Sequence, residues 1–174
     1  MRTIVVVVSL LIGFVGSARA QNLSEAEVAG LRAEVASMTT AFERGEPDEL
    51  IERTYPALYE LAGGQEAYAT AVRQAVEQLR QTGITFVDSQ VGTPTQLYPA
   101  GDEEVCFVPR TSMVEIQGKK FKSTTFMVAI RNKGGKEWKY LDGAGLIKNP
   151  DYLYRFLPDL QRGIELPPNG VEPL

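Results

Sequence analysis

The sequence predicts an α+β protein in which N-terminal helices pack on a curved antiparallel sheet. Residues 24–81 carry apolar side chains at three- and four-residue spacing, which is typical of amphipathic helices. Residues 84–142 are rich in Val, Ile, Thr and Phe between turn signals, which is typical of strands. Helices followed by strands indicate the α+β class rather than alternating βαβ units, and we expect one domain over residues 21–160.

Residues 1–20 have the layout of a cleavable signal peptide. Arg2 precedes an apolar run over residues 4–15, and Ala18-Arg19-Ala20 is a small-x-small cleavage signal. The apolar run is shorter than the roughly 20 residues that a membrane-spanning helix needs. We therefore expect a secreted or periplasmic protein that has no membrane partner after cleavage.

The helical region contains recognisable start and stop signals. Ser24 and Glu27 form a capping box at the start of the first helix, and Gly45 ends it. Shorter helical pieces follow from Pro47, with an interruption at Tyr55-Pro56 because proline disfavours helical geometry in the preceding residue. The other expected boundaries are Gly63-Gly64, a helix over Gln65–Gln81, and a stop at Gly83.

The strand region predicts a meander of long strands. The expected strands are Ile84–Gln90, Thr95–Tyr98, Glu104–Ile116, Lys119–Asn132 and Lys136–Asp142. Gln117-Gly118 and residues 133–135 are hairpin turns, and Pro109 marks an edge position or a bulge. Strands this long must twist or curl, so we expect helices on the concave side with a pocket between the layers.

The C-terminal residues are expected to add little regular structure. A short helix is predicted near Asp151–Phe156. Residues 161–174 contain Pro167, Pro168 and Pro173, and they predict an extended tail.

Composition excludes several classes of chemistry. The chain has no histidine, so Ser-His-Asp and Cys-His catalysis and nearly all zinc sites are excluded. Its single cysteine, Cys106, lies in an apolar run and is expected to be buried rather than nucleophilic. Asp102, Glu103 and Glu104 are the densest acidic cluster and are interpreted as a turn. We expect neither a metal nor a cofactor.

The net charge argues against a nucleic-acid partner. It is −4 for the whole chain, and cleavage would also remove Arg2 and Arg19. The one dense basic stretch, at Lys119, Lys120 and Lys122, is interpreted as a solvated hairpin tip.

Helices followed by a curled meander that ends in Trp138-Lys139-Tyr140-Leu141-Asp142-Gly143 resemble the nuclear transport factor 2-like superfamily. The resemblance covers roughly residues 24–160. The segment Gly135–Leu146, with Tyr55-Pro56 and Gly63-Gly64, is similar to secreted bacterial members. The resemblance to the superfamily implies a cone of bent sheet around long helices, which is the cystatin-like arrangement. Enzymes of the superfamily include scytalone dehydratase, which uses histidines, and ketosteroid isomerase, whose pattern matches no set of positions here.

Seven residues are candidates for lining the pocket. Trp138, Tyr140 and Asp142 share one face of the last expected strand. The alternative is core packing for the two aromatic rings and a turn role for Asp142 before Gly143. Arg110 lies in an apolar strand and should pair with Asp142 or Glu115, as a structural ion pair or as a ligand clamp. The others are tyrosines on or beside the helices, each with an apolar ring and a hydroxyl tip: Tyr55, Tyr59 and Tyr68.

Three functions are compatible with these residues. The first is non-catalytic binding of a small apolar or amphipathic ligand between helices and sheet. The second is an isomerase or hydrolase with Asp142 as base and Tyr59 or Arg110 polarising the substrate. The third is an interaction module whose open sheet face forms a homodimer or binds a partner.

Overall fold

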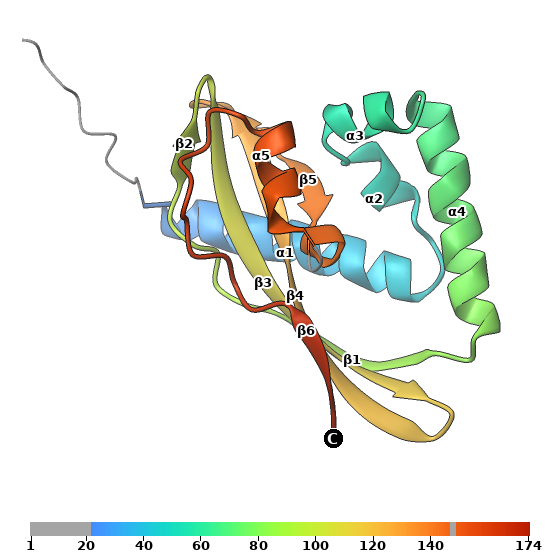
Figure 1. Ribbon diagram of the computed structural model, residues 1–174. Coiled ribbons are helices and arrows are strands. Elements are labelled where there is room, and N and C mark those ends of the chain that lie inside the picture. The colour runs from blue at the N-terminus through green and yellow to red at the C-terminus, as the bar shows by residue number, and fades with distance from the viewer. Residues whose placement is uncertain (1–21, 147–148) are drawn as a thin grey trace, which may run out of the picture.

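The protein consists of a six-stranded antiparallel sheet, four N-terminal helices and a C-terminal segment that returns to the sheet, which confirms the α+β class (Figure 1). The computed structural model describes residues 22–146 and 149–174, so the predicted signal peptide lies outside the described residues. The helices are α1 (Glu25–Glu43), α2 (Asp48–Glu52), α3 (Pro56–Leu61), α4 (Gln65–Gln81) and α5 (Leu153–Phe156), with 3-10 turns η1 (Gly143–Leu146) and η2 (Pro150–Tyr152). The strands are β1 (Thr85–Val91), β2 (Tyr98–Ala100), β3 (Glu103–Ile116), β4 (Lys119–Asn132), β5 (Lys139–Asp142) and β6 (Gly170–Pro173).

Local sequence signals set the helix boundaries as predicted. The Ser24 hydroxyl accepts from the Glu27 backbone N–H, and the Glu27 carboxylate accepts from the Ser24 N–H at 2.8 Å, so the capping box is confirmed. Pro56 begins α3 after the break at Tyr55. α1 contacts β1 and β3, whereas α4 packs against α2 and α3 (Figure 1). Within the described residues, no helix has the length and apolar character needed to cross a membrane.

The centre of the sheet is the hairpin of β3 and β4. The two 14-residue strands pair without a register shift, and Gln117 and Gly118 turn the chain with φ of 51° and 77°. β1 and β2 pair along the outer edge of β3, while β5 and β6 pair along the outer edge of β4. The sheet therefore has one strand more than predicted, because the C-terminal residues add β6.

Two strands begin three residues later than predicted, and the other starts agree to within one residue. The expected strand at Thr95 instead begins at Tyr98, because the Thr95 side chain occupies the place of a backbone partner and accepts from the Phe107 N–H at 3.0 Å. The last meander strand begins at Lys139 rather than Lys136, which leaves Trp138 just outside it.

Pro109 occupies an edge of β3 between the partners β1 and β2. Its carbonyl accepts from the Gly92 N–H at 2.8 Å, and the nitrogen of a strand residue points to the same side as its carbonyl. The Pro109 nitrogen therefore points to the stretch of the β3 edge between the β1 and β2 pairings. The lack of an N–H there costs no hydrogen bond between strands. The register shift lies in β1 instead, between Phe86 and Asp88.

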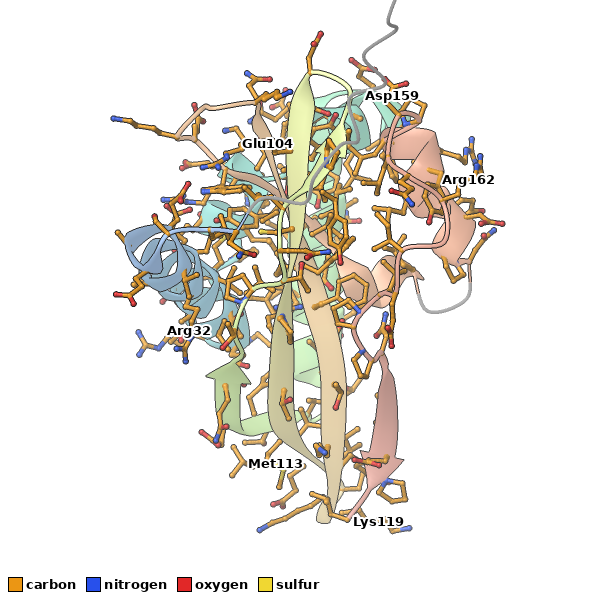
Figure 2. All side chains as sticks on the ribbon, turned by 90° about the vertical axis from the view of Figure 1, so that its left-hand side faces the viewer. Arg32, Glu104, Met113, Lys119, Asp159 and Arg162 are labelled. Carbon is orange, nitrogen blue, oxygen red and sulfur yellow. The ribbon has the colours of Figure 1, made fainter. Side chains whose placement is uncertain are left out.

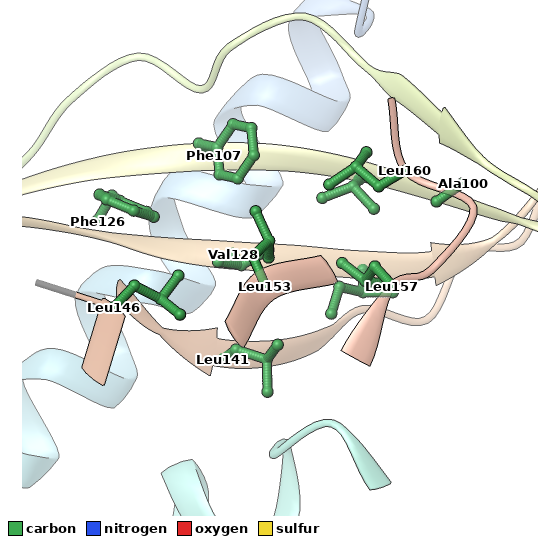
Figure 3. Close-up of a cluster of buried hydrophobic side chains, with 11 residues drawn as sticks. Ala100, Phe107, Phe126, Val128, Leu141, Leu146, Leu153, Leu157 and Leu160 are labelled. Atoms are coloured by element: carbon green, nitrogen blue, oxygen red, sulfur yellow. The ribbon is translucent and has the colours of Figure 1, made fainter. Parts of the chain in front are cut away.

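Each face of the sheet has its own hydrophobic core, because successive side chains of a strand point to opposite faces. On the α1 face the buried side chains are Leu31, Val35, Met38, Leu97, Cys106, Val108, Met127, Ala129, Trp138 and Tyr140. On the opposite face they are Ala100, Val105, Phe107, Phe126, Val128, Ile130, Leu141, Leu146, Leu153, Leu157 and Leu160 (Figure 3).

The C-terminal segment covers the second face. Figure 2 shows α1 on one side of the sheet and the C-terminal segment on the other. The short helix predicted near residues 151–156 is present as η2 and α5. Leu153, Leu157 and Leu160 are buried in the core, and β6 pairs with β4. The segment is therefore a structural layer of the protein, which the sequence did not predict.

Candidate functional site

A cavity of about 160 Å³ lies between the C-terminal half of α1 and the inner face of the β3–β4 hairpin. We call it the hairpin cavity. Its apolar lining consists of Met38, Phe42, Leu50, Phe86, Val114 and Met127, with Ala144 in η1. Its polar lining consists of Thr39, Glu43, Arg110, Ser112, Ser123, Thr125 and Asp142.

The sheet register brings Arg110 and Asp142 together in this cavity. On β4, Thr125 lies opposite Arg110 and Met127 lies opposite Asp142, so both charged side chains project from the α1 face. Arg110 Nη2 donates to Asp142 Oδ2 at 2.9 Å. Of the two partners expected for Arg110, the structure shows Asp142 and not Glu115.

The surroundings of the pair fix both groups. Arg110 Nη1 donates to Thr39 Oγ1 at 3.2 Å, and the Arg110 side chain is 13% exposed. The other carboxylate oxygen of Asp142 accepts from the Ala144 N–H at 2.8 Å. Both oxygens of Asp142 thus already accept hydrogen bonds, which weakens this carboxylate as a general base.

Two buried polar atoms of the cavity lining are not satisfied. Among the described residues, neither Arg110 Nε nor Thr125 Oγ1 has a hydrogen-bond partner. The two residues face each other on adjacent strands. Leaving a buried polar group unpaired costs about 1–3 kcal/mol, so such groups indicate where a further hydrogen-bonding molecule fits.

A second carboxylate, that of Glu43, lies in the cavity wall. The Ser89 hydroxyl donates to it and lies 2.8 Å from the Ser112 hydroxyl, whose oxygen is 3.5 Å from the same Glu43 oxygen. The charged residues of the lining are therefore one cation and two carboxylates.

Trp138 and Tyr140 lie on the same face as Asp142, as predicted, but they pack under α1 outside the hairpin cavity. The Tyr140 hydroxyl donates to Glu34 Oε2 at 2.7 Å, and burial together with this carboxylate raises the pKa of the phenol. The Arg131 guanidinium stacks on Trp138, 4.4 Å from the ring centroid. Both rings are therefore part of the core under α1 and not of the wall of the hairpin cavity.

The three helix-associated tyrosines also lie away from the cavity lining. The Tyr55 hydroxyl donates to Glu103 Oε2 at 2.9 Å, and burial followed by this carboxylate raises the pKa of Tyr55 to about 12. The Tyr59 hydroxyl donates to the Ile51 carbonyl. The Tyr59 and Tyr68 rings meet edge to face with centroids 5.4 Å apart. Of the seven candidates, the structure brings only Arg110 and Asp142 into one cavity.

A buried ion cluster was missed by the sequence analysis. Arg131, whose side chain is 9% exposed, donates to Glu104 at 3.0 Å and to Glu27 at 2.7 Å. Glu103 and Glu104 belong to β3, so the turn interpretation of the acidic cluster holds only for Asp102, while the strand predicted from Glu104 is confirmed. The alternation along β3 was the available signal, because it places Glu104 on the same face as Cys106 and Arg110.

The single cysteine is a core residue. Cys106 is fully buried under α1, and burial raises the pKa of its thiol to about 12. It is therefore inert as a nucleophile near neutral pH. No group of His, Cys, Asp and Glu side chains suited to a metal ion occurs in residues 22–146 and 149–174.

No family model matches this chain, and neither a curated protein nor a solved structure shows significant similarity to it.

Proposed function

We propose that the protein is an exported, non-catalytic member of the nuclear transport factor 2-like superfamily that binds a small amphipathic molecule in the hairpin cavity. Export rests on the signal-peptide pattern of residues 1–20. The superfamily assignment rests on element order and on the closing segment around Trp138-Lys139-Tyr140. The hairpin of long strands beside α1 is compatible with it.

The observation that carries the binding function is the mixed lining of the hairpin cavity. Small-molecule sites combine apolar walls with a few fixed polar groups that orient the ligand. Here Phe42, Phe86 and Met127 supply apolar wall, and Arg110 is held rigidly by Thr39 and Asp142. In this proposal Arg110 has both roles that the sequence suggested. Its guanidinium forms an ion pair with Asp142 and also binds the ligand.

The enzymatic alternative has less support from the geometry. Asp142, its candidate base, already accepts hydrogen bonds from Arg110 and Ala144. Tyr59, one of its candidate polarising groups, donates to a helix carbonyl away from the cavity lining.

The interaction-module alternative needs an open sheet face. α1 covers one face, and the C-terminal segment covers much of the other with Leu153, Leu157 and Leu160 (Figure 2, Figure 3). This arrangement gives less support to dimerisation through a sheet face than to ligand binding.

Native mass spectrometry of the protein purified from its own organism tests the binding function. We expect a bound small molecule that is lost from Ser123→Leu, because Ser123 lines the hairpin cavity and a larger apolar side chain fills it. Thr111→Leu is the matched control, since Thr111 lies on the other face of the hairpin and should leave the bound mass in place. A wild-type protein without bound molecule, or equal retention by both variants, would contradict the proposal.

A further inference from the structure

The charge and hydrogen-bonding capacity of the hairpin cavity indicate what kind of molecule it binds. This inference rests on the proposed binding function and adds the chemical class of the ligand. It starts from the two unsatisfied atoms, Arg110 Nε and Thr125 Oγ1. Nε carries an N–H and can only donate, whereas the threonine hydroxyl can donate or accept.

Of the three nitrogens of the Arg110 guanidinium, Nε is the one without a hydrogen-bond partner among the described residues. Nη2 is held by Asp142 and Nη1 by Thr39, so the plane of the group is fixed from two sides. Thr125 is the direct neighbour of Arg110 across the β3–β4 ladder and projects from the same face. An oxygen within hydrogen-bonding distance of both atoms would accept from both donors at once.

The charges that line the cavity discriminate between ligand classes. Arg110 is the one cation of the lining, and Asp142 and Glu43 are carboxylates that face the same space. A carboxylate ligand would add a third negative charge beside a cation that Asp142 already neutralises. An ammonium group could bind Asp142 or Glu43, but at Nε it would meet another donor and the guanidinium charge, so Nε would stay unpaired. A neutral oxygen avoids both penalties.

The rest of the lining requires an apolar body. Phe42, Phe86 and Val114 come from α1, β1 and β3 and supply ring and methyl surface around the polar pair. We propose that the hairpin cavity binds a small uncharged molecule whose carbonyl oxygen accepts hydrogen bonds from Arg110 Nε and Thr125 Oγ1, with its apolar part against these side chains.

Titration of the ¹⁵N-labelled protein with three probes of one ring size tests the class: cyclohexanone, cyclohexanecarboxylate and cyclohexylammonium. We expect cyclohexanone to shift the amide signals of the cavity strands, with a Kd at least about tenfold lower than that of either charged probe. Thr125→Val removes the hydroxyl at nearly constant shape and should weaken cyclohexanone binding about fivefold. Thr124→Val, the matched change on the opposite face of β4, should leave the Kd unchanged.

The outcomes separate this inference from the function on which it rests. If a charged probe shifts the same amides with equal or lower Kd, or if Thr125→Val binds cyclohexanone as tightly as wild type, the inference fails while binding in the cavity stands. If none of the three probes shifts the cavity amides, both the inference and the proposed function fail.

Discussion

Arg110 and Asp142 are 32 residues apart in sequence, yet Arg110 Nη2 lies 2.9 Å from Asp142 Oδ2 across the strand between them. The ion pair links β3 to the end of β5 and orients the one guanidinium of the hairpin cavity. Its value for stability is modest, because the Asp142 side chain is 41% exposed. We interpret the pair as a means of positioning Arg110 and of neutralising its charge.

Neutralising Asp142 should therefore change ligand preference more than stability. Asp142→Asn keeps the shape but removes one of two carboxylates beside Arg110, and we expect a stability loss of about 1 kcal/mol. Cyclohexanecarboxylate should then gain about tenfold in affinity, measured by the same amide titration. Asp151→Asn in η2 is the control, and an equal gain in both variants would argue against the role of Asp142.

The Glu27 carboxylate should make stability depend on acid pH. Hydrogen bonds from Ser24, and then from Arg131, lower the pKa of Glu27 from 4.5 to about 2. A carboxyl with a lowered folded-state pKa stabilises the fold above its unfolded value and loses that contribution as pH falls from 4.5 towards 2.

Urea unfolding at pH 6 and pH 2.5 measures this contribution as the difference between wild type and Glu27→Gln. The carboxyl is about one-third exposed, so we expect about 1 kcal/mol at pH 6 and little at pH 2.5. Ser24→Ala, which removes the side-chain part of the cap, should also lessen the pH dependence. A wild-type advantage that stays constant between the two pH values would contradict the assignment.

Cys106 should react with thiol reagents only when the protein unfolds. Its thiol is fully buried with a pKa of about 12, so both access and thiolate formation are suppressed in the native state. Iodoacetamide at pH 8 should leave native protein unlabelled and label it fully in urea, as read by intact mass. Rapid labelling of the native protein would show that this core opens readily.

The C-terminal segment should behave as part of the core. Leu153 is fully buried beneath the sheet, and Leu153→Ala should lower the free energy of unfolding by about 2–5 kcal/mol in urea titrations. Leu61→Ala, at a side chain that is 69% exposed, should cost less than about 0.5 kcal/mol. Equal effects of the two substitutions would indicate that the segment detaches before global unfolding.

Local sequence signals predicted where helices and turns lie, whereas long-range contacts determine how these elements pack and pair. The capping box at Ser24, the break before Pro56 and the turn at Gln117-Gly118 each depend on a few consecutive residues, and each was predicted. The packing of Leu157 and the pairing of β6 depend on residues far away in sequence, for which periodicity gives no signal.

The same distinction applies to the candidate site. Arg110 stood out because an apolar strand contains one cation, and strand alternation placed Asp142 on a compatible face. Thr125 and Glu43 have ordinary local contexts, and only the β3–β4 register and the path of α1 bring them to Arg110. Tyr59 carried the expected residue type but has its hydroxyl bound within the helical layer.

Intermolecular NOEs from cyclohexanone test most directly whether the hairpin cavity is a binding site. We predict NOEs from the ring protons to the methyl groups of Met38, Val114 and Met127, which line the cavity from α1, β3 and β4. NOEs confined to the exposed Leu61 on α3, or bound cyclohexanone without NOEs to those three methyl groups, would contradict the account.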